Sequence, residues 1–459
     1  MTTTLITEAA IRAFLARDDR DSIRAALAPL PAADVVHAIA NMETEEIARV
    51  LAALPSAVAS QVFGYFEPRL QVALARAMPR GVLQQLFTDM PHDERADLWK
   101  SLPPAERDAL LPGLAAAERE DVRRLASYPE GTAGSIMTSD YATLAPTLSA
   151  REAIETLRRE APDRETIYEA YVVDEARRLV GVVSLRDLLL APEDRPVSDI
   201  MTREVVFVRA EDPKETVAEK IADYDLIAVP VINGGDMLVG IVTVDDALDV
   251  ARLAQARRLI RFGGTVALGG PDIDLVNSSL WDMFKARYFW LAFLTAFGMV
   301  SSVFVAAQEE ILTEVLVLAA FIAPIIDMGG NTGSQSATLV IRAMALGQVR
   351  SVWRDVGRVL KRDVPVALAL GVGVAVLEVI LALVFKEGLI PDVLWVVGLS
   401  MLACTIAGSL FGVTIPFIAR KLKIDPATLS APLITSVMDL LGIMIYFSIA
   451  YAFLGDMLK

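Results

Sequence analysis

A single carboxylate lies inside the last long apolar run of the chain. The run extends from Leu429 to Leu454, and Asp439 is the only charged residue in it. About 20 apolar residues cross a bilayer, so this run is long enough to span one. A charge at that depth costs about 2.5–3.5 kcal/mol even on the mildest insertion scale, so Asp439 should face protein or water. Thr435, Ser436 and Gly442 share its helix face, which predicts a water-lined path for a cation. A protonated, hydrogen-bonded packing residue is the alternative.

A polar motif, GGNTGSQS, interrupts another apolar run at Gly329–Ser336. Its two glycines and the amides and hydroxyls after them should weaken the helix and leave backbone carbonyls free, which is tolerated only beside a cavity or inside protein. Oxygen ligands of this kind suit hard cations. Close packing of small residues between helices is the alternative.

Three other acids in or beside predicted apolar runs are also candidates for a functional role. Asp327 and Glu378 could be proton-relay groups or paired polar residues. Asp425 precedes Pro426 at the start of the last run, which is the arrangement of a helix N-cap followed by proline in the first turn. A carboxylate at the cytoplasmic mouth of a pathway is an equally good interpretation of Asp425.

The apolar half contains five predicted membrane spans, and the loops between them alternate in charge. Lys and Arg gather before the first span and in the second-to-third and fourth-to-fifth loops, which predicts a cytoplasmic N-terminus and an outside C-terminus. The first thirty residues have no signal-peptide core, which agrees with this orientation. The predicted spans are residues 288–307, 315–341, 364–385, 393–419 and 426–454.

Composition excludes several classes of function. The formal net charge is −15, and nearly all of the acidic excess precedes residue 280, so nucleic-acid binding is not expected. The single cysteine, Cys404, and two histidines, His37 and His92, do not favour disulfides or a zinc or copper enzyme. An intramembrane aspartyl protease is also disfavoured, because no Gly-x-Gly-Asp element occurs. We therefore do not expect an enzyme.

Residues 1–127 have the pattern of stacked short helices. Five prolines recur at intervals of 24, 24, 12 and 12 residues, each at a place where a helix could begin. This repetition predicts an all-α helical solenoid. The prolines are Pro31, Pro55, Pro79, Pro91 and Pro103.

Residues 128–250 contain a tandem repeat. SIMT returns as DIMT, and EAYVVDEARRLVGVVSLRDLL returns as IAVPVINGGDMLVGIVTVDDAL, which predicts two α/β modules side by side. The repeat resembles the cystathionine-β-synthase (CBS) pair, whose Gly-x-x-Ser/Thr-x-x-Asp element commonly holds the ribose of an adenine nucleotide. That resemblance places Ser184, Asp187, Thr243 and Asp246 beside ATP or another adenine nucleotide, although many such pairs bind no known ligand.

The whole chain resembles the MgtE family of bacterial magnesium channels. The resemblance rests on YPEGTAGSIMT, the CBS pair, GGNTGSQSATLVIRAMALG and IDPATLSAPLITSVMDLLG, in this order and with five spans. It implies a multidomain homodimer in the cell membrane, in contact with lipid, with a helical N domain (1–127), tandem CBS domains (128–250), a connecting plug helix (251–284) and a five-helix transmembrane pore domain (285–459).

The resemblance also implies which residues bind Mg²⁺. Magnesium held between the cytoplasmic domains would keep the pore shut, and its loss would open it. Asp439 would be the central pore carboxylate, with Asn331 and Thr435 near the same ion and Asp425 at the cytoplasmic mouth. The implied regulatory acids are Glu215, Asp225, Asp246 and Asp249 in and after the second CBS copy, and Asp93 in the N domain.

One segment departs from the family pattern. The connecting helix is usually rich in acids, but here it reads ARLAQARRLIRF. Magnesium feedback on this chain is therefore a weaker expectation than magnesium transport, and the arginines could instead form direct salt bridges to the acidic domains. The alternative function is an ion-coupled secondary transporter of divalent cations (Mg, Co, Ni or Mn), with Asp439, Glu378 or Asp327 as a proton relay.

Overall fold

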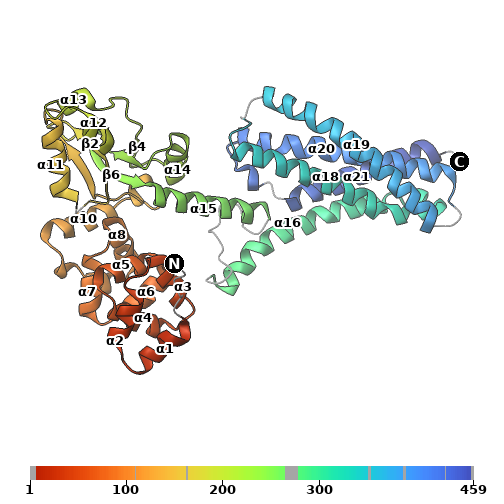
Figure 1. Ribbon diagram of the computed structural model, residues 1–459. Coiled ribbons are helices and arrows are strands. Elements are labelled where there is room, and N and C mark those ends of the chain that lie inside the picture. Colours follow the sequence, from red (N-terminus) through yellow and green to blue (C-terminus); the bar gives the residue numbers. More distant parts are fainter. Residues whose placement is uncertain are drawn as a thin grey trace. The chain divides into compact units, whose positions relative to one another are not determined.

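The chain forms two compact units, Met1–Arg252 and Leu253–Lys459 (Figure 1). The structure, a computed structural model, describes residues 7–108, 110–161, 164–263, 278–349, 353–385, 389–428 and 431–455.

The first unit begins with a stack of short helices. The five recurring prolines occupy the N-cap positions of α3, α5, α7, α8 and α9, where a missing N–H costs no helical hydrogen bond. Helices two apart in sequence pack together, as in α2, α4, α6 and α8, around buried Leu51, Phe63 and Phe87. This confirms the predicted all-α arrangement. The helices are α1 (Glu8–Ala16), α2 (Arg20–Leu27), α3 (Ala32–Ile39), α4 (Thr44–Ala53), α5 (Ser56–Gly64), α6 (Pro68–Ala77), α7 (Arg80–Thr88), α8 (His92–Ser101), α9 (Pro104–Arg107) and α10 (Ala116–Ala126).

The rest of the first unit consists of two small α/β modules, as the repeat predicts. Each has a three-stranded sheet whose first two strands are parallel and whose last two are antiparallel. The first module contains β1 (Tyr141–Leu144), α11 (Ala150–Glu160), β2 (Thr166–Val173), β3 (Leu179–Ser184), α12 (Leu185–Leu190) and α13 (Val197–Ile200). The second contains β4 (Val208–Arg209), α14 (Lys214–Asp223), β5 (Ala228–Ile232) and β6 (Leu238–Thr243).

The SIMT and DIMT segments join the two modules to each other. The amide of Thr138, in SIMT, donates to the carbonyl of Ile241 in the second module at 2.8 Å. Reciprocally, the amide of Val182 in the first module donates to the carbonyl of Thr202, in DIMT, at 3.0 Å. Each repeat therefore extends the sheet of the other, which explains why the short motif occurs twice.

The second unit contains five helices that are long and apolar enough to cross a membrane, among the residues that the structure describes. They confirm the five predicted spans. They are α16 (Leu280–Ala306), α18 (Ala319–Ala345), α19 (Trp353–Phe385), α20 (Pro391–Lys421) and α21 (Ala431–Leu454), with a short α17 (Glu309–Glu314) before α18. The last span is shorter than expected, because residues Pro426–Thr428 form a separate 3-10 turn. The connecting helix α15 (Val244–Phe262) starts inside the second α/β module, so no break occurs at residue 250.

Glycines set the spacing of the central membrane helices. A Cβ at Gly408 on α20 would overlap the carbonyl oxygen of Gly329 on α18, and one at Gly412 would overlap that of Gly333. Gly330 faces α21, where a Cβ would come within 2.9 Å of Cγ2 of Thr435. Paired small residues four apart let two membrane helices approach backbone to backbone.

The GGNTGSQS motif is helical throughout. The prediction that it weakens the helix and leaves backbone carbonyls free was therefore wrong. Helix α18 runs without interruption from Ala319 to Ala345. The glycines use their lack of a side chain for packing. The hydroxyl of Thr332, and that of Thr338 just after the motif, donate back to carbonyls four residues earlier, at 2.9 and 2.7 Å. The motif therefore contributes side chains and close packing, not free backbone carbonyls.

Candidate functional site

Two carboxylates and an amide come together on α18 and α21. Asp439 is half-buried on α21, and the carboxylate of Asp327 on α18 is close enough to interact with it electrostatically. Asn331, one turn after Asp327, donates from Nδ2 to Oδ2 of Asp327 at 2.8 Å. Thr435, one turn before Asp439, packs against Gly330 of α18. The arrangement offers oxygen ligands beside a membrane-crossing segment, which suits a hard, hydrated cation.

The sequence left the roles of Asp327 and Glu378 open, and the structure brings Asp327 to this site. Its spacing of four residues from Asn331 places both on one helix face, and this spacing was the signal that could have linked them. Glu378 lies elsewhere, on α19, which packs mainly against α20.

Asp425 lies just before α21 and accepts hydrogen bonds there. Its Oδ1 accepts the backbone N–H of Ala427 at 3.0 Å, and its Oδ2 accepts from Nη1 of Arg261 at 3.0 Å. Arg261 belongs to the last turn of α15, so one of the unexpected arginines of the connecting helix pairs with an acid at the start of the last span. The residue thus caps a turn and also holds an ion pair.

Asp363 of α19 forms hydrogen bonds with two other membrane helices. The sequence alone did not identify it as a structural residue. Its Oδ2 accepts from the hydroxyls of Ser336 on α18 and Ser409 on α20, at 2.8 and 2.6 Å, and both serines are buried. In the sequence Asp363 stands just before an apolar run, where it resembles any charge at a span end. The only available signal was the presence of small hydroxyl residues within two neighbouring apolar runs.

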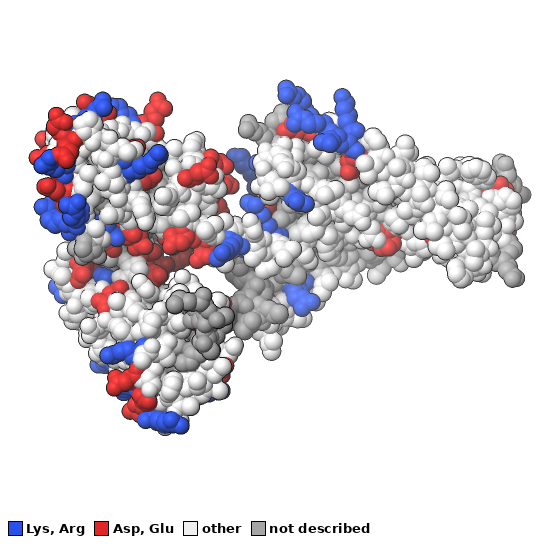
Figure 2. Space-filling view, viewed as in Figure 1, with Lys and Arg blue, Asp and Glu red and all other residues white. Residues whose placement is uncertain are grey.

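An acidic cluster forms in the first unit, where α8 approaches the α/β modules (Figure 2). Asp93 and Glu94 lie in the first turn of α8, and Asp246 lies in the first turn of α15, with Oδ2 accepting from Thr243 at 3.0 Å. Burial and repulsion from neighbouring carboxylates raise the pKa of Glu94 and of Asp246 to about 8, and burial raises the pKa of Asp93. One oxygen of Glu94 is buried without a hydrogen-bond partner. The carboxylates of the cluster therefore repel one another at a site partly removed from water.

His92 anchors the helix that carries this cluster. Its Nδ1 is 2.8 Å from Oδ2 of Asp121 and 2.7 Å from Oγ of Ser139, and its Nε2 is 3.4 Å from Oδ2 of Asp140. Burial alone would raise the pKa of Asp121, but hydrogen bonds from His92, Ser139 and Arg124 outweigh it and hold that pKa below its usual value. The start of α8 is thereby fixed to the segment that leads into β1.

The other acids expected to bind metal are more dispersed. Glu215 is half-buried in the first turn of α14, and Asp225 is exposed after that helix with a left-handed φ of 52°. Asp249 is exposed on α15 and pairs with Arg252 at 3.4 Å. Within the described ranges, no three His, Cys, Asp or Glu side chains are arranged to hold a metal ion directly. A cation at the acidic cluster would therefore keep part of its water shell, as Mg²⁺ usually does.

The first copy of the Ser/Thr-x-x-Asp element borders a cleft of about 600 Å³. Ser184 lines this cleft and donates to Oδ2 of Asp187 at 2.6 Å, while Tyr168 and Ile227 supply apolar surface. In the second copy, Asp246 belongs to the acidic cluster instead. The equivalent residues of the two copies therefore lie in different environments, a cleft in the first copy and the acidic cluster in the second.

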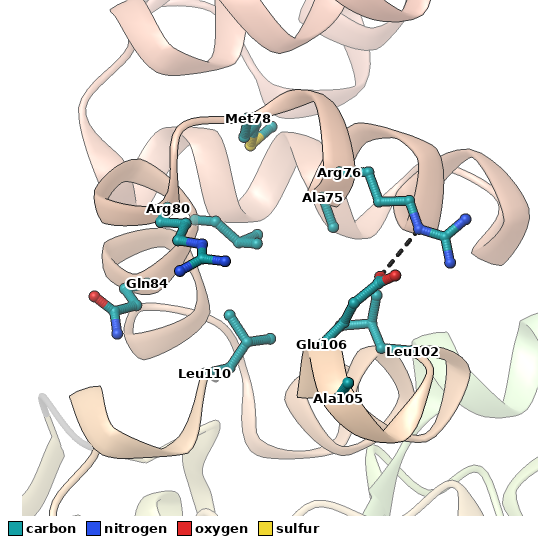
Figure 3. Close-up of a pocket in the computed structure, with 10 residues that line it drawn as sticks. Ala75, Arg76, Met78, Arg80, Gln84, Leu102, Ala105, Glu106 and Leu110 are labelled. Atoms are coloured by element: carbon teal, nitrogen blue, oxygen red, sulfur yellow. Dashed lines mark hydrogen bonds and ion pairs between the residues drawn. The ribbon is translucent and has the colours of Figure 1, made fainter. Parts of the chain in front are cut away.

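A second cavity, of about 520 Å³, lies among the N-terminal helices (Figure 3). Its one acid, Glu106, is paired with Nε of Arg76 at 3.0 Å, and Arg80 and Gln84 also line it. Because its carboxylate is neutralised by an arginine, this cavity does not offer a cation site.

Comparison with known proteins gives a consistent result along the chain. Three family descriptions match it: "MgtE intracellular N domain" at residues 30–131, "CBS domain" at 133–194 and 197–252, and "Divalent cation transporter" of the MgtE type at 322–449. The chain is 36% identical over 397 residues to the magnesium transporter MgtE of Thermus thermophilus, covering 86% of each chain. It is 31% identical over 398 residues to that of Bacillus subtilis, covering 87% of this chain and 86% of the relative.

Two solved structures resemble the first unit. The cytosolic domain of the Mg²⁺ channel MgtE in complex with ATP matches with a TM-score of 0.51 and 36% identity, covering 53% of this chain and 99% of that one. The soluble part of a magnesium transporter matches with a TM-score of 0.50 and 29% identity, covering 54% and 97%. The relatives are named as transporters, which confirms that the chain is not an enzyme. The chain belongs to the MgtE family, with a cytosolic N-terminal part and a multi-pass membrane part.

Proposed function

We propose that this protein is a magnesium-selective channel of the cell membrane that works as a homodimer. Asp439 carries the proposal, because it is a half-buried carboxylate in a membrane-crossing helix and interacts with a second carboxylate on α18. The relatives of the chain are named as magnesium transporters. The N-terminus lies in the cytoplasm and the C-terminus outside in this proposal, as the positions of Lys and Arg in the loops predict.

A twofold axis beside α21 completes the ion site. One Asp439 is a weak site for a divalent ion, but a symmetric dimer supplies two without further sequence. Mg²⁺ loses its waters reluctantly, so the two carboxylates act through a retained hydration shell. Asn331 and Thr435 lie on the helix faces that border Asp439, where an amide and a hydroxyl can contact that shell.

The cytosolic part senses magnesium in this proposal. A divalent cation at Asp93, Glu94 and Asp246 offsets the mutual repulsion of these carboxylates and holds α8 against the α/β modules. Glu215, Asp225 and Asp249 are the further acids that the family resemblance assigns to sensing. The Arg261–Asp425 ion pair holds the connecting helix at the mouth of the pathway without any metal. Closure therefore depends less on magnesium than an acidic connecting helix would require.

An adenine nucleotide binds in the cleft beside Ser184 in this proposal. The hydroxyl and carboxylate of Ser184 and Asp187 fit a ribose, and Tyr168 and Ile227 fit a base. The related cytosolic domain was solved in complex with ATP. Thr243 and Asp246 form the equivalent pair of the second copy, but Asp246 also belongs to the acidic cluster.

Current through the purified protein in a planar bilayer separates the channel from a coupled transporter. The channel predicts ohmic Mg²⁺ current without a proton gradient, larger than the current of Co²⁺, Ni²⁺ or Mn²⁺, and a Glu378→Gln variant with unchanged current. Flux that requires a proton gradient, and that Glu378→Gln abolishes, would show the secondary transporter instead.

A further inference from the structure

One end of the second unit carries a cluster of exposed cations from two helices. Figure 2 shows the Lys and Arg side chains gathered at the start of α19, next to the white apolar length of the helices. We call this surface the basic end; it consists of Arg354, Arg358, Lys361 and Arg362 of α19 and Arg420 and Lys421 of α20, all exposed.

The two helices meet at a tryptophan. Nζ of Lys421, at the end of α20, lies 5.2 Å from the ring centre of Trp353, the first residue of α19. The indole is 66% exposed. Trp is enriched where a membrane meets water, because its ring is amphipathic. The basic end therefore has the composition of a surface at the level of lipid headgroups.

The neighbouring acids leave most of this charge uncompensated. Asp355 is 9% exposed and pairs with Arg358 at 3.0 Å, and Asp363 accepts from two buried serines. In the described part of the chain, none of the other five cations of the basic end forms an ion pair with an acid. Among the residues that the structure describes, this surface has five cations without an acidic partner, and only Arg358 is paired with an acid. Such a surface attracts anions.

The length of α19 places the basic end at the membrane surface. At about 1.5 Å per residue, residues 364–385, apolar apart from Glu378, cover about 33 Å, close to the roughly 30 Å of a bilayer core. Residues 353–363 then extend about 16 Å beyond the core, through the headgroup layer. Lys361 and Arg362 lie at its inner edge, and Arg358 and Arg354 lie farther out.

We propose that the basic end binds the headgroups of anionic phospholipids in the membrane that the protein spans. The depth of Lys361 and Arg362 favours lipid over a water-soluble acidic partner, which would have to enter the headgroup layer to reach them. Arginine pairs with phosphate through parallel hydrogen bonds, and lysine adds a point charge. This binding is separate from cation transport, so it stands whether or not the proposed function is correct.

Lipid retention by the full-length protein tests the proposal. Three proteins are placed in nanodiscs with fluorescent phosphatidylglycerol or phosphatidylcholine: the wild type, a Lys361→Gln/Arg362→Gln variant and a control. The control, Arg158→Gln/Arg159→Gln, removes the same charge from exposed positions of α11. Each juxtamembrane cation contributes about a fivefold preference, so the first variant should bind phosphatidylglycerol about 30-fold more weakly. The control should bind as the wild type does, and high salt should weaken the preference of both for phosphatidylglycerol.

Three results would overturn the proposal. The wild type could bind the two lipids equally, the two double variants could bind phosphatidylglycerol equally, or the preference could persist at high salt. If the Lys361→Gln/Arg362→Gln variant keeps its lipid preference but loses contact with the cytosolic part, measured by crosslinking, the basic end binds an acidic protein surface and the lipid assignment is wrong.

Discussion

Replacement of Gly408 by alanine tests whether close packing of α18 and α20 positions the ion pathway. The added Cβ would overlap the carbonyl oxygen of Gly329. A carbon and a carbonyl oxygen normally approach no closer than about 3.3 Å, so the two helices must separate by about 1 Å. The overlap is with backbone, so no side-chain rotation relieves it.

The expected effect on transport exceeds the effect on folding. Overpacking of this kind costs about 1–3 kcal/mol of stability. Helix α18 also carries Gly330, against which Thr435 of α21 packs, so its displacement moves Asn331 away from Asp439. A 1 Å displacement of positioned groups can reduce a rate by about 100-fold, so we expect Mg²⁺ uptake to fall at least tenfold.

The assay is Mg²⁺ uptake into proteoliposomes, normalised to protein that elutes as a single species. Gly373→Ala on α19 and Gly298→Ala on α16 are the matched controls, because nothing lies within 4 Å of a Cβ at either position. They should transport normally, and each could gain about 0.5–1 kcal/mol of helix stability. Normal uptake by the Gly408→Ala variant would refute the packing argument.

Three other predictions concern single sites. Asp363→Ala leaves two buried serine hydroxyls without an acceptor and should cost about 2–6 kcal/mol of stability. Adding Ser409→Ala removes one of these hydroxyls and should restore part of that stability. Thermal denaturation of the single and double variants checks this, and additive losses of stability would contradict it. Glu94 and Asp246 have pKa values near 8, so the folded protein keeps protons that the unfolded chain releases above about pH 4.5. Raising the pH from 5 to 8 without Mg²⁺ should therefore lower the stability of α8. Backbone hydrogen exchange in α8 measures this, and exchange that slows with pH, after correction for its intrinsic rate, would contradict the assignment. Asp187→Ala should weaken binding of ATP by the full chain in calorimetry, and unchanged affinity would remove Asp187 from the site.

Features with local signals were predictable from the sequence. Pro31 and Pro79 mark helix starts because proline fixes φ and lacks an N–H, and each begins a helix here. The five spans follow from the length of apolar runs. The SIMT and DIMT repeat indicated two modules, although not that each segment pairs with the other module.

Contacts that depend on the rotation of one helix against another were not predictable. Asp363 meets Ser336 and Ser409 only because three helices present these positions to one another. The ion pair of Arg261 with Asp425 joins residues 164 positions apart, which no local pattern reveals. The glycines of α18 were ambiguous for the same reason, since loss of helix and close packing both favour small residues.

Asp439 is the residue on which the proposed function most directly depends. Mg²⁺ uptake by proteoliposomes containing the Asp439→Asn variant, which keeps the shape of the side chain and removes its charge, is the decisive measurement. Uptake should fall to the level of empty liposomes while the protein remains folded and membrane-inserted. Uptake equal to the wild type would show that the ion does not pass this carboxylate, and the proposed pathway would be wrong.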